Sequence, residues 1–238
     1  MVTAYDYPSA KIIDKVSVDY ILVGDSLAMT ILGHPDTKSI TMDEMLHHVK
    51  AVVKGAPNSK IIADMPINSY TNVSLALKNA KRFMAIGAHA VKIEGAKFQI
   101  IKKLIANHIP VIGHLGLLPQ TAEKYSVQGR DAKEAQQILL EAQKLDSLGI
   151  NALILECVPA YLAKKISNAI NTPTIGIGAG IDCDGQVLVL ADLIGLSDFK
   201  GKMIKQYTDV KSIIKKAVTE FKTDVISKKF PGKENTFV

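Results

Sequence analysis

The sequence contains little cysteine, no tryptophan and no long apolar run, and these absences exclude several classes of protein. The two cysteines, Cys157 and Cys183, cannot build a disulfide framework and lack the paired spacing of a zinc site. We expect two reduced thiols, at least one of them buried. No stretch reaches about 18 uninterrupted apolar residues, and the first residues lack the basic-then-apolar order of a secretory signal. These observations predict a cytoplasmic protein without a membrane-spanning segment.

Aromatic residues are also scarce, at 5%, while the formal net charge is +6. Residues 1–199 carry 19 basic and 19 acidic side chains, whereas residues 200–238 carry ten lysines and four acidic residues. In this C-terminal segment, apolar residues from Val210 to Phe221 recur at helical spacing, and aromatic residues do not alternate with the lysines. The pattern predicts a packed helix with a solvated basic face, and it argues against a nucleic-acid site.

What the sequence does contain is a core-forming pattern, with 47% hydrophobic and 22% charged residues. Eight short aliphatic runs alternate with helical patterns. The runs are 1–5, 20–24, 60–64, 90–94, 110–114, 152–156, 174–178 and 187–195. Runs of this length suit strands that are covered on both faces, and their alternation with helices is typical of parallel βαβ units. Eight such units predict a (β/α)8 TIM barrel.

The segments between the runs support this fold. The clearest helical pattern runs from Arg130 to Leu148 and ends before Gly149. The segments VSVDYILVGD, AIGAHAVKIEG and SLGINALILEC each end a helix and enter a strand that finishes in a carboxylate. The link between the seventh and eighth runs is too short for a full helix. We expect one domain over residues 1–238, with a barrel core over 1–199 and a Lys-rich helical extension over 200–238.

Ionisable residues stand where five successive runs end, namely Asp25, Asp64, Glu94, His114 and Glu156. One such carboxylate is most often a helix cap or a turn former, but several in series indicate a site, because barrel chemistry lies at the carboxyl ends of the strands. Converging carboxylates repel one another, and a bound cation is the simplest way to keep them charged. Oxygen ligands without cysteine favour a hard ion, Mg²⁺ in the first place.

Three further features leave alternatives open. Lys92 shares a strand face with Glu94, where it could oppose the charge of an anionic substrate or pair with a neighbouring carboxylate. Ser26 follows Asp25 and could bind the same anion or cap the next turn. The glycine-rich segment 174–182 (TIGIGAGID) lacks both the spacing and the following helix of a dinucleotide site. Its glycines could form an anion nest or allow close packing at the barrel mouth.

Taken in order, the motifs of the chain resemble those of the ketopantoate hydroxymethyltransferase family. The motifs are VTAYDYPSA (2–10), LVGDSLAMTILGH (22–34), ADMP (63–66), VKIEG (91–95), GHLGLLPQ (113–120), VQGR (127–130), LILECVP (153–159), IGIGAG (175–180) and DGQVLVLADLIG (184–195). The resemblance extends over nearly the full length, and the ordered set is far more specific than any single motif.

The resemblance implies a TIM barrel of the phosphoenolpyruvate/pyruvate type and a Mg²⁺-dependent cytoplasmic enzyme that assembles as a homo-oligomer, commonly a decamer. Its reaction transfers a hydroxymethyl group from 5,10-methylenetetrahydrofolate to the 2-oxo acid 3-methyl-2-oxobutanoate, giving 2-dehydropantoate for pantothenate biosynthesis. The carried-over roles are a metal site of Asp25, Asp64 and Glu94, substrate contacts of Asp25, Ser26, Asp64 and Lys92, and Glu156 as proton acceptor. His114 matches a position that lines the same site.

The chain departs from the family pattern at three places. It begins at the first predicted strand, so we expect it to lack an N-terminal helix and part of an oligomer contact. Residues 121–126 (TAEKYS) stand where the family has a longer Gly-Gly loop, which we expect to alter lid closure and folate contacts but not the metal site. Asn235, in FPGKENTF, stands where a histidine is usual.

Two other functions are compatible with the residues. A Mg²⁺-dependent carbon–carbon lyase acting on a related 2-oxo acid would use the same metal site without folate. A non-catalytic barrel is the second alternative, although a purely structural barrel has no need of a charged mouth.

Overall fold

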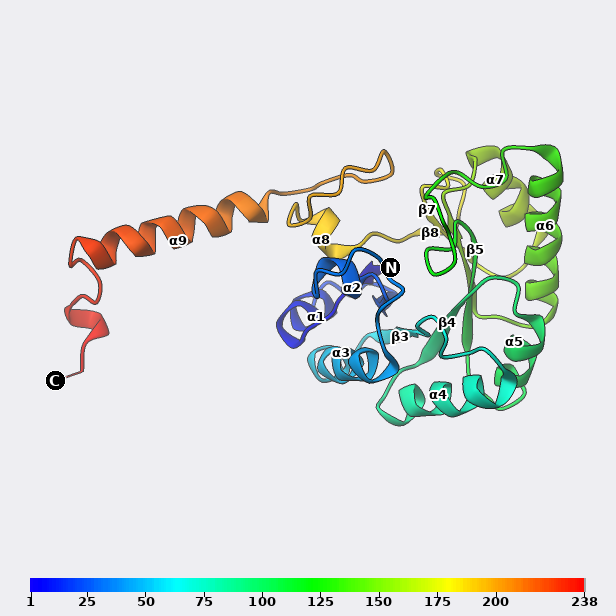
Figure 1. Ribbon diagram of the computed structural model, residues 1–238, viewed down its shortest axis with the longest axis horizontal. Coiled ribbons are helices and arrows are strands. Elements are labelled where there is room, and N and C mark those ends of the chain that lie inside the picture. Colours follow the sequence, from blue (N-terminus) through cyan, green and yellow to red (C-terminus); the bar gives the residue numbers. More distant parts are fainter. Residues whose placement is uncertain (238) are drawn as a thin grey trace. The chain divides into compact units, whose positions relative to one another are not determined.

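The structure, a computed structural model, describes residues 1–237 and contains an eight-stranded parallel sheet (Figure 1). The strands lie side by side in the order of the chain. They are β1 (Val2–Thr3), β2 (Tyr20–Val23), β3 (Lys60–Asp64), β4 (Ala90–Glu94), β5 (Val111–Gly116), β6 (Ala152–Glu156), β7 (Thr174–Ile177) and β8 (Gly185–Gln186). All seven pairings are parallel, as the alternation of runs and helices predicts.

Hydrogen bonds between the two ends of the sheet close it into a barrel. The amide of Thr3 donates to the carbonyl of Leu188 over 3.2 Å, and Val2 forms an isolated parallel bridge with the same residue. The amino group of Met1 donates to the carbonyl of Gln186 over 3.0 Å. The predicted (β/α)8 barrel is therefore confirmed.

The last strand is shorter and earlier than the sequence predicts. The apolar run 187–195 was expected to be a strand, but the ladder covers Gly185–Gln186 and the run continues into a short helix, α8 (Leu190–Leu193). An apolar run of this length fits a strand or a buried helix equally well, so periodicity alone could not decide. The link from β7 to β8 contains no helix in the structure, as expected.

Helices follow the strands and surround the barrel (Figure 1). They are α1 (Tyr7–Asp14), α2 (Leu27–Thr30), α3 (Met42–Gly55), α4 (Val73–Ala85), α5 (Phe98–Ile105), α6 (Ala132–Ser147) and α7 (Ala160–Ala169). Thr41, Asn72 and Asp131 begin α3, α4 and α6 by accepting a backbone N–H with their side chains. Helix α6 matches the predicted range, and Gly149 follows it with a φ of +82°. No helix within residues 1–237 is long and apolar enough to cross a membrane.

The barrel core consists of aliphatic side chains from the strands. One buried cluster comprises Leu22, Ile62, Ala90, Ile112, Ala152, Ile154, Ile175 and Val187. Such branched apolar side chains fill the interior of a TIM barrel and make it a packed core, not a pore. The interior thus holds the strands in a fixed register, and the residues at their carboxyl ends are positioned by it.

The chain divides into two compact units, Met1–Val189 and the residues from Leu190 onward. The second unit contains α8, the helix α9 (Val210–Ile226) and a short 3-10 helix, η1 (Lys233–Asn235). Helix α9 confirms the predicted helix, but none of its residues is buried. Its apolar side, including Val218 and Phe221 at 60% and 55% exposure, is uncovered, which contradicts the expected packed helix. The sequence pattern defines an apolar face but not what covers it.

Candidate functional site

The predicted site residues converge at the carboxyl ends of neighbouring strands. Asp64 and Glu156 end β3 and β6, and both Lys92 and Glu94 belong to β4. The register aligns Asp64 with Lys92 and Glu94 with His114. Because side chains in a strand alternate between faces, Lys92 and Glu94 project to the same side. The residues that were predicted from the strand ends therefore belong to four adjacent strands of the structure.

Lys92 forms the electrostatic centre of the cluster. Its Nζ lies 2.7 Å from Oδ2 of Asp64 and 3.5 Å from Oε1 of Glu94, and its side chain is 6% exposed. Burial alone would lower the pKa of Lys92, but the carboxylates of Asp64, Glu94 and Asp25 outweigh burial and raise it. Of the two sequence interpretations, the structure shows the carboxylate pair, and the ammonium stays charged at neutral pH.

Asp25 follows β2 and joins the same cluster. Its backbone N–H donates to Oδ2 of Asp64 over 3.2 Å. Burial raises the pKa of Asp25 well above its usual range, and repulsion from the Asp64 carboxylate adds to the effect. For Glu94, burial also acts to raise the pKa, but Lys92 and then His114 outweigh it, so the pKa is lowered. Three buried carboxylates therefore share one lysine ammonium, and burial together with their mutual repulsion raises the pKa of both Asp25 and Asp64.

The donor set fits a divalent hard cation. Within residues 1–237, the buried oxygen Oδ1 of Asp64 has no hydrogen-bond partner, and Oε1 of Glu94 has only ion-pair contacts, with Lys92 at 3.5 Å and His114 at 3.4 Å. A buried, unpaired carboxylate oxygen is costly unless a cation or donor binds it. No group of three or more His, Cys, Asp or Glu side chains in the described part of the chain is arranged to hold an ion. Mg²⁺, however, is commonly bound by one or two carboxylates together with water and substrate oxygens.

His114 connects the carboxylate cluster to Glu156. Its ring is 1% exposed, with Nδ1 3.4 Å from Oε1 of Glu94 and Nε2 3.3 Å from Oε2 of Glu156. Burial and the Lys92 ammonium act to lower the pKa of His114, but its contacts with Glu156 and Glu94 outweigh them and raise it to about 9. Glu156 itself keeps 15% of its side chain exposed. The site therefore offers one partly accessible carboxylate beside a buried imidazolium.

Ser26 follows Asp25 and occupies the N-cap position of α2, but its side chain does not cap the helix. Its Oγ is 2.7 Å from the phenol oxygen of Tyr5, and within the described residues its side chain makes no capping bond to α2. Burial raises the pKa of Tyr5 to about 12, so the phenol stays protonated. Sequence reasoning missed Tyr5, although it lies in the quoted motif VTAYDYPSA.

Gln120 and Tyr70 were also missed. Both are buried, Gln120 on the loop after β5 and Tyr70 on the loop after β3. The side-chain amide of Gln120 donates to Oδ2 of Asp25, and its backbone N–H donates to Oε2 of Glu94. The signal in the sequence was a glutamine at the end of the motif GHLGLLPQ, four residues beyond its strand.

Two weaker expectations are resolved by packing. A Cβ on Gly180 would lie 2.6 Å from the Cβ of Ala160, which supports close packing as the reason for the glycine-rich segment. Cys157 and Cys183 are reduced, as expected, but both are half-buried, so the expectation that at least one is buried was wrong. Both cysteines lie near chain reversals at strand ends, where packing is less complete than inside the barrel.

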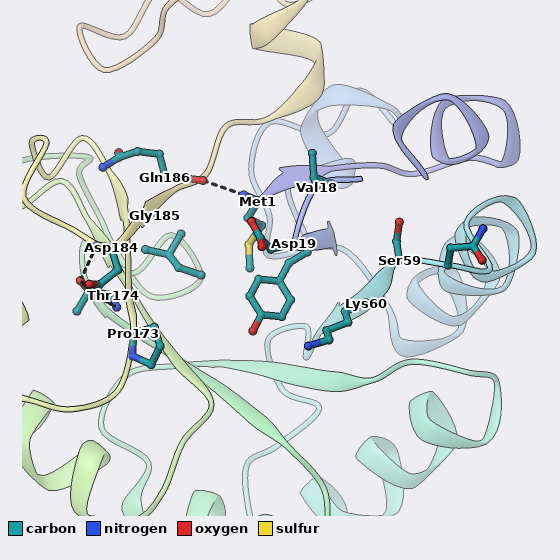
Figure 2. A pocket seen from close by; sticks show the side chains of 13 residues that line it. Met1, Val18, Asp19, Ser59, Lys60, Pro173, Thr174, Asp184, Gly185 and Gln186 are labelled. Carbon is teal, nitrogen blue, oxygen red and sulfur yellow. Dashed lines mark hydrogen bonds between the residues drawn. The ribbon is translucent and has the colours of Figure 1, made fainter. Parts of the chain in front are cut away.

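A cavity of about 420 Å³ lies elsewhere, at the amino ends of the strands (Figure 2). Its lining includes Tyr20, Lys60 and Thr174, the first residues of β2, β3 and β7. None of the site residues named above lines it. Barrel chemistry belongs to the opposite, carboxyl end of the strands, so we assign the candidate site there.

Comparison with known proteins identifies the family. A sequence model described as ketopantoate hydroxymethyltransferase matches residues 1–233. The chain belongs to the ketopantoate hydroxymethyltransferase family. The 3-methyl-2-oxobutanoate hydroxymethyltransferase of Caldicellulosiruptor bescii is 48% identical over 100% of this chain and 92% of the relative. The enzyme of the same name from Thermosipho melanesiensis is 49% identical over the same shares.

Solved structures confirm the barrel type of this family member. A phosphonopyruvate hydrolase in complex with oxalate and Mg²⁺ has a TM-score of 0.65 and 13% identity, covering 98% of this chain and 87% of that one. A 2,3-dimethylmalate lyase of the PEP mutase/isocitrate lyase superfamily has a TM-score of 0.60 and 14% identity, covering 79% and 74%. Identities this low establish the fold alone, and the fold is the predicted TIM barrel.

Proposed function

We propose that the protein is a hydroxymethyltransferase that converts 3-methyl-2-oxobutanoate into 2-dehydropantoate, with 5,10-methylenetetrahydrofolate as one-carbon donor and Mg²⁺ as cofactor. The family and the names of its relatives support the transferase class and the 2-oxo acid. The observation that carries the assignment to a site is the strand-end cluster, in which Lys92 contacts Asp64 and His114 lies between Glu94 and Glu156.

In this proposal, Asp25, Asp64 and Glu94 would hold the cation, and Oδ1 of Asp64, which has no hydrogen-bond partner among the described residues, would be available to it. A bound Mg²⁺ supplies Lewis acidity, which withdraws electrons from the keto group and acidifies the C3–H bond beside it. Ser26 donates a hydrogen bond to the substrate carboxylate. Burial, and then repulsion from Asp64, raise the pKa of Asp25, and a bound cation would favour its ionised form.

Glu156 is the proposed base because it is the accessible carboxylate of the cluster. It removes the C3 proton of the 2-oxo acid, and the Lys92 ammonium faces the negative charge that develops on the enolate oxygen. The electron pair left at C3 forms a bond to the methylene carbon of the folate. The bonds from that carbon to both folate nitrogens break: the new bond to C3 replaces one, and the hydroxyl group of water replaces the other. The two nitrogens of the released tetrahydrofolate take up the proton removed from C3 and the remaining proton of water. His114, charged below its pKa of about 9, holds the Glu156 carboxylate in place.

Proton exchange tests the first half of this chemistry. We expect C3 of 3-methyl-2-oxobutanoate to exchange its proton for deuterium in the presence of Mg²⁺, followed by NMR. Glu156→Gln should abolish the exchange, whereas Glu220→Gln, an exposed carboxylate on α9, should leave it unchanged. Wild-type exchange rates in Glu156→Gln would refute the assignment of the base.

Dependence on folate tests the second half. Formation of 2-dehydropantoate should require 5,10-methylenetetrahydrofolate and should release tetrahydrofolate in equal amount. A carbon–carbon lyase on the same barrel would cleave its 2-oxo acid without folate, so folate-independent turnover would support that alternative. The absence of both exchange and turnover would favour the non-catalytic barrel.

A further inference from the structure

Gln120 occupies an unusual place for an uncharged residue. It is 1% exposed, it lies on a loop, and it contacts two of the three carboxylates of the candidate metal site. Its side-chain Nε2 donates to Oδ2 of Asp25 over 2.9 Å, and its backbone N–H donates to Oε2 of Glu94 over 3.1 Å. Neither the strand-end reasoning nor the proposed chemistry gives this residue a role.

The surroundings of Gln120 fix the orientation of its amide. Nε2 also donates to the backbone carbonyl of Met65 over 2.9 Å, and a carbonyl can only accept. On the other side, the phenol of Tyr70 donates to Oε1 over 2.5 Å. Both amide hydrogens are therefore used, one on the carboxylate of Asp25 and one on the loop after β3. A buried amide that is satisfied in this way has little freedom to turn.

These bonds occupy one oxygen of each of two carboxylates. With Oε2 of Glu94 held by the backbone of Gln120, Oε1 has no hydrogen bond in residues 1–237 and only ion-pair contacts with Lys92 and His114. Among the described residues, Asp64 also has one oxygen with hydrogen bonds and one without. Its Oδ2 accepts from Lys92 and from the Asp25 backbone, whereas Oδ1 has no hydrogen-bond partner within residues 1–237. Donors that occupy one carboxylate oxygen orient the other toward a metal ion.

We infer that Gln120 is a positioning residue of the cation site: it orients the carboxylates of Asp25 and Glu94 toward a divalent hard cation, and Tyr70 holds its amide in the required orientation. The inference rests on the proposed function for the presence of the cation. Gln120 itself need touch neither cation nor substrate, since it acts through the two carboxylates.

Cation binding without substrate tests this directly. We use Mn²⁺ in place of Mg²⁺, because free Mn²⁺ gives a signal in electron paramagnetic resonance. Titration of this signal with protein gives the dissociation constant of Mn²⁺ at the candidate site. Gln120→Met keeps the side-chain volume but removes every side-chain hydrogen bond, and we expect it to weaken Mn²⁺ binding by roughly 10- to 100-fold. Tyr70→Phe should weaken binding several-fold in the same direction. Gln137→Met, on the exposed side of α6, is the matched control and should bind within twofold of wild type.

Turnover separates positioning from chemistry. In Gln120→Met, saturating Mg²⁺ should restore much of the lost exchange at C3, because the base is intact. In Glu156→Gln, Mg²⁺ should restore none. Mn²⁺ binding within twofold of wild type in a folded Gln120→Met protein would overturn the inference. If that variant does not fold, unchanged binding in Tyr70→Phe would overturn it. Failure of the wild-type protein to bind Mn²⁺ at all would instead refute the cation in the proposed function.

Discussion

At the scale of single residues, the charge balance of the site depends mainly on Lys92. It neutralises part of a buried cluster of three carboxylates and is nearly excluded from solvent. Removing one partner of a buried ion pair leaves the other charge uncompensated. We therefore expect Lys92→Met to lower the free energy of unfolding at pH 7 by about 3 kcal/mol, in addition to abolishing turnover.

The pH dependence of this loss has a defined sign. Lys92 lowers the pKa of Glu94, so its contribution is fully present above the ordinary carboxyl pKa and is lost as the pH falls through the lowered pKa of Glu94. The deficit of Lys92→Met, measured by urea unfolding, should accordingly stay constant from pH 7 to about pH 5 and shrink as the pH falls below about 4. Lys50→Met, an exposed lysine on α3, should cost little at either pH. A deficit that does not depend on pH would indicate lost packing in place of lost charge.

The same residues show how far sequence reasoning reaches at this scale. Asp64, Glu94 and Glu156 could be placed because a strand has a defined end and two defined faces. Gln120 and Tyr70 could not, because a loop residue has no periodicity that predicts where its side chain points. Their roles depend on contacts between loops that are distant in the sequence, which only the folded chain brings together.

At the scale of the elements, Gly116 allows strands β5 and β6 to approach each other closely at the site. It ends β5 opposite Glu156, has a φ of +93°, and a Cβ there would lie 2.2 Å from the backbone carbonyl oxygen of Glu156. Gly116→Ala must therefore displace the end of β6. Overpacking together with the left-handed backbone should cost about 3 kcal/mol of unfolding free energy and reduce exchange at C3.

Gly149→Ala is the matched control for this substitution. Gly149 has a similar φ of +82°, but a Cβ there meets nothing within 4 Å. Only the backbone penalty applies, so we expect a loss of about 1 kcal/mol and unchanged exchange. Equal losses in the two variants, measured by urea unfolding, would show that the contact with Glu156 does not constrain the site.

Elements differed in how well they could be predicted. Strands β3, β4 and β6 match their predicted ranges to the residue, because turn residues or charges bound each buried run. The final run, 187–195, has no such boundary, and its first residues complete the barrel through the bridge of Leu188 to Val2 before α8 begins. The pairing partner at the other end of the chain, not the local pattern, determines where this strand stops.

At the scale of the whole molecule, the two compact units differ in how they are stabilised. The helices α6 and α9 have nearly the same length, 16 and 17 residues. Helix α6 buries Ile138, Leu139, Ala142 and Leu145, whereas α9 buries none of its residues. Most helix stability in proteins comes from a packed apolar face, and an isolated helix of this length is marginal in water. The charge surplus of residues 200–238 adds repulsion between the lysines around α9.

We therefore predict that the two helices exchange their amide hydrogens at very different rates in the monomer. At a protein concentration where sedimentation shows one copy, the amides of α9 should exchange orders of magnitude faster than those of α6, as followed by mass spectrometry of peptides. Protection of α9 that increases with protein concentration would mean that another copy covers Val218 and Phe221, as the homo-oligomer implied by the family resemblance would do. Protection equal to that of α6 in the monomer would contradict the prediction, because the helix would then draw its stability from within one chain.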